Sequence, residues 1–331
     1  MRFVVYGAGA IGGVVGGRLV QHDQEVVLIA RGEHHDAIRD HGLRLVAPAA
    51  DTFEGTETVT LAVPVVSHPA GIDFRDDDVV LMAMKSQHTG KALSALAATA
   101  PPTVAVVCAQ NGVANEPAAL RLFADVYGVC VVCPALHLDP GVVEAHAAPV
   151  TGMLDLGRYP LGVDKRAEAI AAVFASSSFD ADARPDIMRW KYAKLLNNLG
   201  NAVDALCGPD AGSRELQQRA WAEGAACLHA AGIEPISPEE DAARRGDRFQ
   251  WGGSAARSRP GASSWQSLAR GTGSIEADYL NGEIVLLGRL HRVPTPVNEL
   301  LQRMAGRAAR EGTPPGSISP EELIRMLPDG E

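Results

Sequence analysis

The chain has 331 residues, of which 46% are hydrophobic and 21% are charged. This composition is typical of a globular protein and excludes disorder as the main state, and the length exceeds what one hydrophobic core usually supports, so we expect two domains. Its 40 acidic residues outnumber its 30 basic ones, and the formal charge of −10 disfavours nucleic acid and anionic membranes as partners, because both bind clustered Lys and Arg.

The amino-terminal stretch has no charge between Arg2 and Gly17, as a secretory signal also would. Six of its residues are glycine, however, which is a poor composition for an apolar signal helix. No apolar run reaches the roughly 18 to 20 residues of a membrane helix. The five cysteines are sparse and odd in number, which does not suggest a disulfide framework. We therefore expect a cytoplasmic protein.

The first half of the chain alternates short apolar runs with helix-like segments. Continuous apolar strands separated by helices are typical of a parallel α/β sheet that is buried on both faces. The expected strands are residues 3–6, 26–29, 79–82, 104–107, 127–133 and 150–156.

The second half reads as helical. We expect one long helix over residues 186–206, further helices over 275–290 and 295–310, and a helix start at Ser319, where a Ser cap precedes Pro320. Residues 241–264 read as a loop or weak helix. The predicted architecture is a Rossmann-type parallel sheet domain over 1–183, followed by an all-α domain over 184–331.

The first expected strand leads into the motif Gly7-Ala8-Gly9-Ala10-Ile11-Gly12, which fits G-x-G-x-x-G. In that pattern the first glycine allows a tight turn, the second lets the backbone approach a pyrophosphate, and the third allows close helix–strand packing. The helix that follows offers backbone N–H donors to the anion. The alternative is a glycine-rich turn without a ligand. The strand before the motif and the helix after it favour a dinucleotide site.

Arg31 follows the second expected strand, where an NAD site usually carries Asp or Glu for the ribose hydroxyls. A guanidinium there can pair with a 2′-phosphate instead. We therefore expect NADP(H), with an ordinary surface arginine as the alternative. Two more loops follow expected strands at the same sheet edge: Lys85 to His88, and Gln110-Asn111-Gly112. Each alone is an ordinary polar loop, but their shared edge makes Lys85, His88 and Asn111 cofactor candidates.

A polar stripe marks the expected helix over 186–206. Lys194, Asn198 and Asn201 are spaced i, i+4 and i+7, which places all three on one helix face. A solvated face is the alternative, but such faces favour Glu, Lys and Arg over the poor helix former asparagine. Reduction of a ketone by hydride needs a proton donor, and a partly desolvated lysine can serve. Lys191, nearly one turn earlier, leaves the choice of lysine open.

Three other patterns carry less weight. Cys130 and Cys133 have redox or metal spacing but read as small buried residues of a strand. His34-His35 reads as part of a surface helix, and we expect no metal site. Arg244 and its neighbours Arg245 and Arg248 read as a solvated loop, with an anion-binding lid as the alternative.

Taken together, these residues resemble the ketopantoate reductase (2-dehydropantoate 2-reductase) family over nearly the whole chain. The most specific match is the segment from Ile275 to Gly282, with its acidic, aromatic and Asn-Gly residues. The resemblance implies these roles: Lys194 as general acid, Asn198 and Ser264 as substrate ligands, Glu276 on the substrate hydroxyl, Arg31 and Lys85 at the 2′-phosphate and adenosine end, and Asn111 at the nicotinamide ribose. The family often has an asparagine where this chain has Ala202; Asn201 lies one residue earlier and is kept as a substrate ligand.

The resemblance implies NADPH-dependent reduction of 2-dehydropantoate to pantoate in pantothenate and coenzyme A biosynthesis, with the substrate bound between the two domains. One alternative is a reductase of another small 2-keto acid or a β-hydroxyacid dehydrogenase. Another, from a different class, is a non-catalytic NADP-sensing protein. The expected partner is a small 2-keto acid, and the oligomeric state stays open, with a homodimer as one option.

Overall fold

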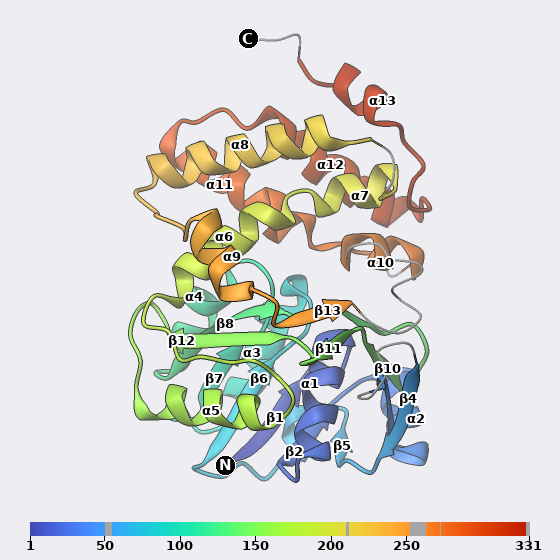
Figure 1. Cartoon of the computed structure of the whole chain (residues 1–331), viewed down its shortest axis with the longest axis vertical. Coiled ribbons are helices and arrows are strands. Elements are labelled where there is room, and N and C mark those ends of the chain that lie inside the picture. Colours follow the sequence, from blue (N-terminus) through green and yellow to red (C-terminus); the bar gives the residue numbers. More distant parts are fainter. Residues whose placement is uncertain (50–54, 210–211, 252–262, 272, 329–331) are drawn as a thin grey trace. The chain divides into compact units, whose positions relative to one another are not determined.

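The structure is a computed structural model that describes residues 1–49, 55–209, 212–251, 263–271 and 273–328 (Figure 1). Its residues form two compact units. Unit 1 comprises Met1–Gln110, Asn115–Met188 and Pro238–Arg259, and unit 2 comprises Asn111–Ala114, Arg189–Ser237 and Pro260–Glu331. The expected division after residue 183 did not include two exchanges between the units: Asn111–Ala114 belongs to unit 2, and Pro238–Arg259 belongs to unit 1. Among the described residues, no helix combines the length and hydropathy needed to cross a bilayer.

Unit 1 is built on a seven-stranded sheet of order β12-β8-β7-β6-β1-β2-β5. All neighbouring strands are parallel except β12, which runs antiparallel to β8. Every residue of β1 and of β6 is buried, as expected for strands covered on both faces. The predicted α/β class is confirmed, and each predicted strand overlaps an observed one. The bounds are β1 Arg2–Tyr6, β2 Glu25–Ile29, β5 Val65–Val66, β6 Asp78–Met82, β7 Ala105–Cys108, β8 Val126–Val132 and β12 Met153–Arg158.

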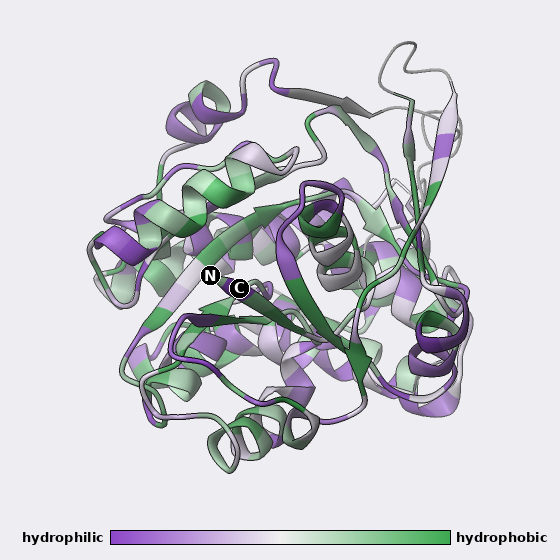
Figure 2. Ribbon diagram, turned by 90° about the horizontal axis from the view of Figure 1, so that it is seen from below, coloured by the Kyte–Doolittle hydropathy of each residue, from purple (hydrophilic) through white to green (hydrophobic). Residues whose placement is uncertain are grey.

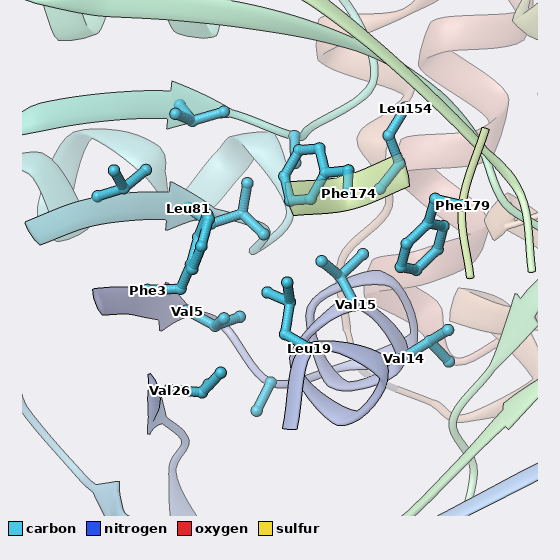
Figure 3. Packing of buried hydrophobic residues seen from close by; sticks show 14 of the residues in the cluster. Phe3, Val5, Val14, Val15, Leu19, Val26, Leu81, Leu154, Phe174 and Phe179 are labelled. Carbon is cyan, nitrogen blue, oxygen red and sulfur yellow. The ribbon is translucent and has the colours of Figure 1, made fainter. Parts of the chain in front are cut away.

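Helices cover both faces of this sheet, and alternate residues of each strand enter separate cores. Phe3 and Val5 of β1 lie in one cluster with α1 and α5, whereas Val4 and Tyr6 lie in another with α3. Figure 3 shows the first cluster, in which the rings of Phe3 and Phe174 lie 5.9 Å apart. Burying each such large side chain stabilises the fold by about 1.5–3 kcal/mol. Figure 2 shows the central strands coloured hydrophobic and many hydrophilic residues on the helices and loops around them. The helices of unit 1 that flank the sheet are α1 Ala10–Gln21, α2 Gly32–His41, α3 Thr89–Ala97, α4 Asn115–Leu120 and α5 Lys165–Ser176, with short 3-10 turns η1 Pro69–Gly71 and η2 Ser86–His88.

Two smaller sheets in unit 1 were not predicted. One has the order β4-β3-β10-β9, and the other pairs β11 with β13. The strand β4 has the sequence TETVTL and is exposed at its first five residues, so it lacks the apolar run that marks a buried strand. Pairing with β3 over six residues, and not its own composition, defines it. The bounds are β3 Leu43–Pro48, β4 Thr56–Leu61, β9 Ala135–Leu136, β10 Val142–Ala145, β11 Ala147–Pro149 and β13 Phe249–Trp251.

The segment at residue 238, which joins unit 1 from the second half of the sequence, includes α9 (Pro238–Arg245) and β13. Arg244 of α9 is only 7% exposed. Its guanidinium donates to both carboxylate oxygens of Asp155 at 2.6 and 2.8 Å and to Asp180 at 2.8 and 3.1 Å. Arg248 also pairs with Asp180 at 2.7 Å. The expectation of a solvated arginine-rich loop is therefore wrong for Arg244, because two carboxylates on the sheet side compensate its buried charge.

Unit 2 is helical in the residues described, as predicted. The helix expected over 275–290 begins instead as a 3-10 turn, and the helix expected over 186–206 is broken after Asn198. The predicted cap at Ser319 is confirmed, since its Oγ accepts from the backbone N–H of Glu322 at 3.1 Å. The bounds are α6 Ile187–Asn198 (whose first two residues belong to unit 1), α7 Asn201–Cys207, α8 Arg214–Ala230, α10 Ser263–Ala269, η4 Glu276–Tyr279, α11 Asn281–His291, α12 Pro296–Glu311 and α13 Pro320–Arg325.

Candidate functional site: a glycine loop in unit 1 and a lysine–asparagine helix in unit 2

The glycine loop in unit 1 is shaped by the close approach of backbone to backbone. Gly7 has φ of +102°, and a Cβ there would lie 2.7 Å from the backbone nitrogen of Met84, so only glycine fits. The N–H of Gly7 donates to the carbonyl of Ile29 at 3.1 Å. The turn therefore lies against the ends of two neighbouring strands, β2 and β6.

The next two glycines fit a dinucleotide cradle. A Cβ on Gly12 would meet Gly7 O and come within 2.9 Å of Ala83 Cβ, so this glycine allows α1 to pack closely. A Cβ on Gly9 would meet nothing within 4 Å, so the space beside Gly9 is open. Gly9 is the N-cap of α1, no side chain caps that end, and its first turn has no acidic residue. Open space at an uncapped helix N-terminus is what a pyrophosphate requires. The predicted residues Gly7, Ala8, Gly9, Ala10, Ile11 and Gly12 thus lie where the motif places them.

Arg31 lies directly after the chain leaves β2 and Ala30. It is the N-cap residue of α2, in extended conformation with φ −136° and ψ 158°. Its side chain is exposed, and within the described part of the chain it makes no hydrogen bond or ion pair. A guanidinium without a protein partner at this strand end is able to bind an anionic ligand group. The structure places Arg31 where the sequence predicted it.

The loop after β6 carries the other two cofactor candidates of unit 1. Lys85 is half-buried and precedes η2, and His88 is exposed at the end of that turn. Buried polar side chains behind the loop hold it in place: Gln110 donates to Thr89 Oγ1 at 2.6 Å, and Thr89 donates to Asn115 Oδ1 at 2.8 Å. Asn115 in turn donates to Ser86 Oγ at 3.2 Å. The sequence analysis did not predict that Ser86, Thr89 and Asn115 are buried and bonded to one another, because nothing in the residues next to them in the sequence indicates that a polar side chain is buried.

Asn111 differs from the other predicted cofactor residues because its segment belongs to unit 2. The neighbouring Gly112 has φ of +77°, and a Cβ on it would lie 2.9 Å from the carbonyl oxygen of Tyr279. This contact brings the Asn111 segment against η4, which begins with Glu276. The structure therefore groups Asn111 with the predicted catalytic residues.

Lys194 and Asn198 lie one turn apart on α6, as their spacing predicted. Both side chains are half-buried, whereas Lys191 is only 3% exposed. The Nδ2 atom of Asn198 is buried and has no hydrogen-bond partner among the described residues. Buried polar atoms are usually paired, and an unpaired amide donor is costly unless a ligand or water accepts from it. This unsatisfied donor is the main structural indication of a ligand site on α6.

Asn201 lies on the next helix, so the prediction of one continuous helix over 186–206 is wrong. The chain turns at Leu199 and Gly200, and Asn201 begins α7. The break frees the carbonyl of Leu199, which accepts from Asn281 Nδ2 at 3.1 Å. Asn281 also donates to Asn298 Oδ1 at 3.0 Å. Since Asn281 is 1% exposed and Asn298 is fully buried, a protein side chain here replaces the missing helical hydrogen bond.

Glu223 of α8 completes this buried network. Its carboxylate accepts from the backbone N–H groups of Val297 at 2.8 Å and Asn298 at 3.0 Å, in the first turn of α12, and from Asn298 Nδ2 at 2.7 Å. A carboxylate at a helix N-terminus is favoured by the helix dipole. Burial nevertheless raises the pKa of Glu223, and these three hydrogen bonds oppose the rise. The network links the break after α6 to α8, α11 and α12.

Ser264 and Glu276 are both buried, with exposures of 2% and 4%. Ser264 lies on α10, which packs against α7 and hence against the helix that Asn201 begins. Glu276 is the first residue of η4. A plain exposed helix glutamate, the alternative for Glu276 judged on local sequence alone, is excluded by its burial. A buried carboxylate requires compensating donors, which suits a role in a site better than one on the surface.

Of the two cysteines predicted to be buried in a strand, Cys130 is buried in β8. Cys133 instead follows that strand and is half-buried, and its Sγ contacts the carbonyl oxygen of Thr151 at 3.7 Å. In the part of the chain that the structure describes, no group of three or more His, Cys, Asp or Glu side chains is arranged to hold a metal ion.

Two family models match the chain and together cover most of it. The model described as ketopantoate reductase PanE/ApbA matches residues 3–160, and the model of the C-terminal part of the same family matches residues 186–309. The 2-dehydropantoate 2-reductase of Halobacterium salinarum is 31% identical over 323 residues, covering 94% of this chain and 100% of that protein. The enzyme of the same name from Pyrococcus horikoshii is 27% identical and covers 91% of this chain and 95% of its own length.

Solved structures show the same fold. A PanE/ApbA family ketopantoate reductase from Ralstonia eutropha matches with a TM-score of 0.77 and 27% identity, covering 94% of this chain and 99% of that one. A D-mandelate dehydrogenase, solved with NADH and anilino(oxo)acetate, also matches with a TM-score of 0.77, at 22% identity and over 94% of this chain and 99% of its own. At that identity the second likeness concerns the fold alone.

Proposed function

Because the chain belongs to the ketopantoate reductase PanE/ApbA family, we propose that it reduces 2-dehydropantoate to pantoate with NADPH. The protein is an oxidoreductase that acts on a keto or CH–OH group and uses a nicotinamide cofactor. The specific substrate, the preference for NADPH, and the place in pantothenate and coenzyme A biosynthesis in the cytoplasm are parts of the proposal. A small 2-keto acid is the partner, and a homodimer stays a prediction.

The observation that supports this function best is the buried, unpaired Nδ2 of Asn198, one turn from Lys194. A 2-keto acid carries a carbonyl oxygen and a carboxylate, both of which accept hydrogen bonds from an amide. When bound, the cofactor supplies the hydride to the keto carbon. Lys194 then donates a proton to the carbonyl oxygen, where negative charge develops.

The other residues of unit 2 would orient the substrate. Glu276 is buried, and its carboxylate would accept a hydrogen bond from the substrate hydroxyl. Ser264 and Asn201 would bind further polar groups of the substrate, and Asn111 the nicotinamide ribose. Each of these side chains belongs to unit 2. This assignment leaves unit 1 to hold the pyrophosphate and the adenosine end of the cofactor.

In unit 1, the open space at Gly9 and the uncapped N-terminus of α1 would receive the pyrophosphate. The exposed guanidinium of Arg31 would pair with the 2′-phosphate, and the half-buried Lys85 would lie nearby, with His88 on the same loop. The end of β2 carries no carboxylate to bond the ribose 2′-hydroxyl of NAD. These features support NADPH over NADH.

A second candidate function is the reduction of a different 2-keto acid with NADH. The same fold occurs in a D-mandelate dehydrogenase that was solved with NADH, so the fold alone is compatible with both candidates. A panel of 2-keto acids with NADPH and NADH, followed by the absorbance of the reduced nicotinamide, separates the two candidates. We expect the highest kcat/KM with 2-dehydropantoate and NADPH. A non-catalytic sensor would turn over no member of the panel.

Lys194→Ala tests the proton donor, and Lys191→Ala is its matched control on the same helix. We expect Lys194→Ala to lower kcat by about 10²- to 10⁴-fold, the usual contribution of a general acid, while NADPH still binds. The control should lower kcat much less. If Lys191→Ala instead shows the large loss of kcat and Lys194→Ala keeps near-normal turnover, Lys191 is the proton donor.

Arg31→Ala tests the preference for NADPH. Removing a charge-assisted contact to the 2′-phosphate should weaken NADPH binding by about tenfold and leave NADH binding nearly unchanged. The dissociation constants of both cofactors can be measured by nicotinamide fluorescence. Equal losses for both cofactors would contradict a contact with the 2′-phosphate.

A further inference from the structure

His34 links the glycine loop to the helix that follows Arg31. It is the third residue of α2, which begins at Gly32 with Arg31 as its N-cap. Its Nε2 lies 2.7 Å from the carbonyl oxygen of Ala8, in the middle of the glycine motif. Its Nδ1 lies 2.9 Å from the backbone nitrogen of Gly141. One imidazole therefore bridges three segments of unit 1 that are far apart in the sequence.

The chemistry of its two partners determines which tautomer His34 adopts. The backbone N–H of Gly141 can only donate, so Nδ1 accepts and carries no proton. Nε2 therefore carries the proton and donates it to the carbonyl of Ala8. Burial, and then the ring of His137 at a centroid distance of 4.2 Å, lower the pKa of His34 to about 4, so the ring is neutral at pH 7.

The donor of the second bond is held in place by close packing. Gly141 has φ of +76°, and a Cβ on it would lie 2.9 Å from the Cβ of Ala37, one turn after His34 on α2. The ring of His137 adds a further contact, and its own Nδ1 lies 2.9 Å from the carbonyl oxygen of Val142. The imidazole thus has one orientation that satisfies both of its nitrogens.

We propose that His34 is a positioning residue for cofactor binding, which fixes the spacing between the glycine loop and Arg31. The inference rests on the proposed dinucleotide site in unit 1. The pyrophosphate and the 2′-phosphate belong to one ligand, so both anchors can act together only at a defined separation. Ala8 lies between the two glycines that shape the loop, and Arg31 lies three residues before His34. The hydrogen bond from Nε2 ties one anchor to the other.

Two conservative variants separate the two hydrogen bonds of His34. In His34→Asn, the amide oxygen takes the place of Nδ1 and still accepts from Gly141, but the side chain is too short to reach Ala8. In His34→Gln, the amide nitrogen takes the place of Nε2 and still donates to Ala8, while the bond from Gly141 is lost. Only the bond to Ala8 touches the glycine loop. The two variants should therefore differ in cofactor affinity and not simply in stability.

We expect His34→Asn to raise the Kd for NADPH by about tenfold, and His34→Gln by about threefold or less, since one buried hydrogen bond differs between them. At saturating NADPH, kcat should stay within about twofold of wild type for both variants, because His34 touches no reacting atom. The matched control is His35→Asn, on the next residue of α2, whose ring contacts Asp36 at 3.0 Å. Its Kd should equal that of wild type.

The measurement is NADPH binding by fluorescence, with thermal unfolding of each variant alongside. Equal Kd values for His34→Asn, His34→Gln and wild type would overturn the proposal, as would a larger loss in His34→Gln than in His34→Asn. If His34→Asn does not fold, near-wild-type affinity in His34→Gln supports the proposal, and a loss of tenfold or more contradicts it. Failure of the wild-type protein to bind NADPH would instead refute the proposed cofactor site. Binding without turnover of 2-dehydropantoate would refute only the proposed substrate.

Discussion

Replacing Asn281 with Ala tests whether the break between α6 and α7 is held from within unit 2. Asn281 begins α11 and is 1% exposed. Its Nδ2 donates to the carbonyl of Leu199, which the break leaves without a helical partner, and to Oδ1 of Asn298. The Ala variant removes both donors and adds no group that can replace them. Two buried acceptors would then have no partner in unit 2.

The size of the effect follows from those two bonds. A buried acceptor that loses its donor costs about 1–3 kcal/mol, and partial relaxation around the smaller side chain lowers the sum. We therefore expect the free energy of unfolding to fall by about 2–4 kcal/mol, which is a large part of the total for a typical domain but leaves the protein folded. Release of the Leu199 carbonyl should also let α6 extend toward Asn201, which would misplace Asn198. We expect kcat to fall by about tenfold or more as a result, since small displacements of positioning groups carry penalties of that size.

Urea unfolding measures the first quantity, and the initial rate of NADPH oxidation with 2-dehydropantoate measures the second. Asn197→Ala is the matched control, because Asn197 is exposed on α6 next to the predicted site. It should change stability by less than about 0.5 kcal/mol. The KM for NADPH should change little in either variant, because neither residue is among the proposed cofactor residues and the glycine loop and Arg31 belong to unit 1. A stable Asn281→Ala protein with wild-type kcat would show that the break does not depend on this side chain.

Two further pairs of variants test unit 1. Gly9→Ala should leave the free energy of unfolding within about 0.5 kcal/mol of wild type but weaken NADPH binding, because its Cβ would enter space that is open in the protein. Gly12→Ala should lower the free energy of unfolding by about 1–3 kcal/mol, because its Cβ would meet the Gly7 carbonyl and the side chains of Ala83 and Val5. Equal effects in urea unfolding would contradict this distinction. Arg244→Gln should lower the free energy of unfolding by about 2–3 kcal/mol, because it breaks the buried ion pair with Asp155, although Asp155 keeps a hydrogen bond from Arg184. The control Arg245→Gln removes only the i,i+4 pair with Asp241, which contributes about 0.3–0.5 kcal/mol. The hydrogen bonds from Arg244 also hold the pKa of the Asp180 carboxyl below its usual value, so the stabilisation from this pair is fully present at pH 7 and is lost as the pH falls below about 4. If Arg244→Gln lowers the free energy of unfolding by the same amount at pH 7 and at pH 3, this reasoning is wrong.

Much of the fold could be predicted from the sequence, because its main elements carry strong local patterns. The strands of the main sheet are continuous apolar runs, and Ser319 with Pro320 marks a helix start that the structure confirms. The small sheet that contains β3 and β4 could not be predicted in this way. Its strand β4 is polar and exposed over most of its length, and it exists through pairing with a partner. Strand pairing is a property of two distant segments and not of either one.

In the candidate site, too, some features could be predicted from local sequence and others could not. The glycine motif, Arg31 and the pair Lys194–Asn198 are local patterns, and their spacing along the chain is enough to predict their place on a loop, a strand end and a helix. The break after Asn198 is not local, since the carbonyl of Leu199 finds its donor on Asn281, 82 residues later. A helix-like stretch of sequence gives no indication of such a partner.

The sequence by itself determined the fold class, the glycine loop and the placement of Lys194 and Asn198 one turn apart on a helix, because backbone propensities and residue spacing act over a few residues. Only the tertiary structure decided which polar groups are buried and what satisfies them. His34, read from the sequence as part of a surface helix, bonds to the glycine loop, and Arg244, read as solvated, is buried between two carboxylates. The physical reason is that burying a polar group is favourable only when its partner is in place, and that partner comes from elsewhere in the chain.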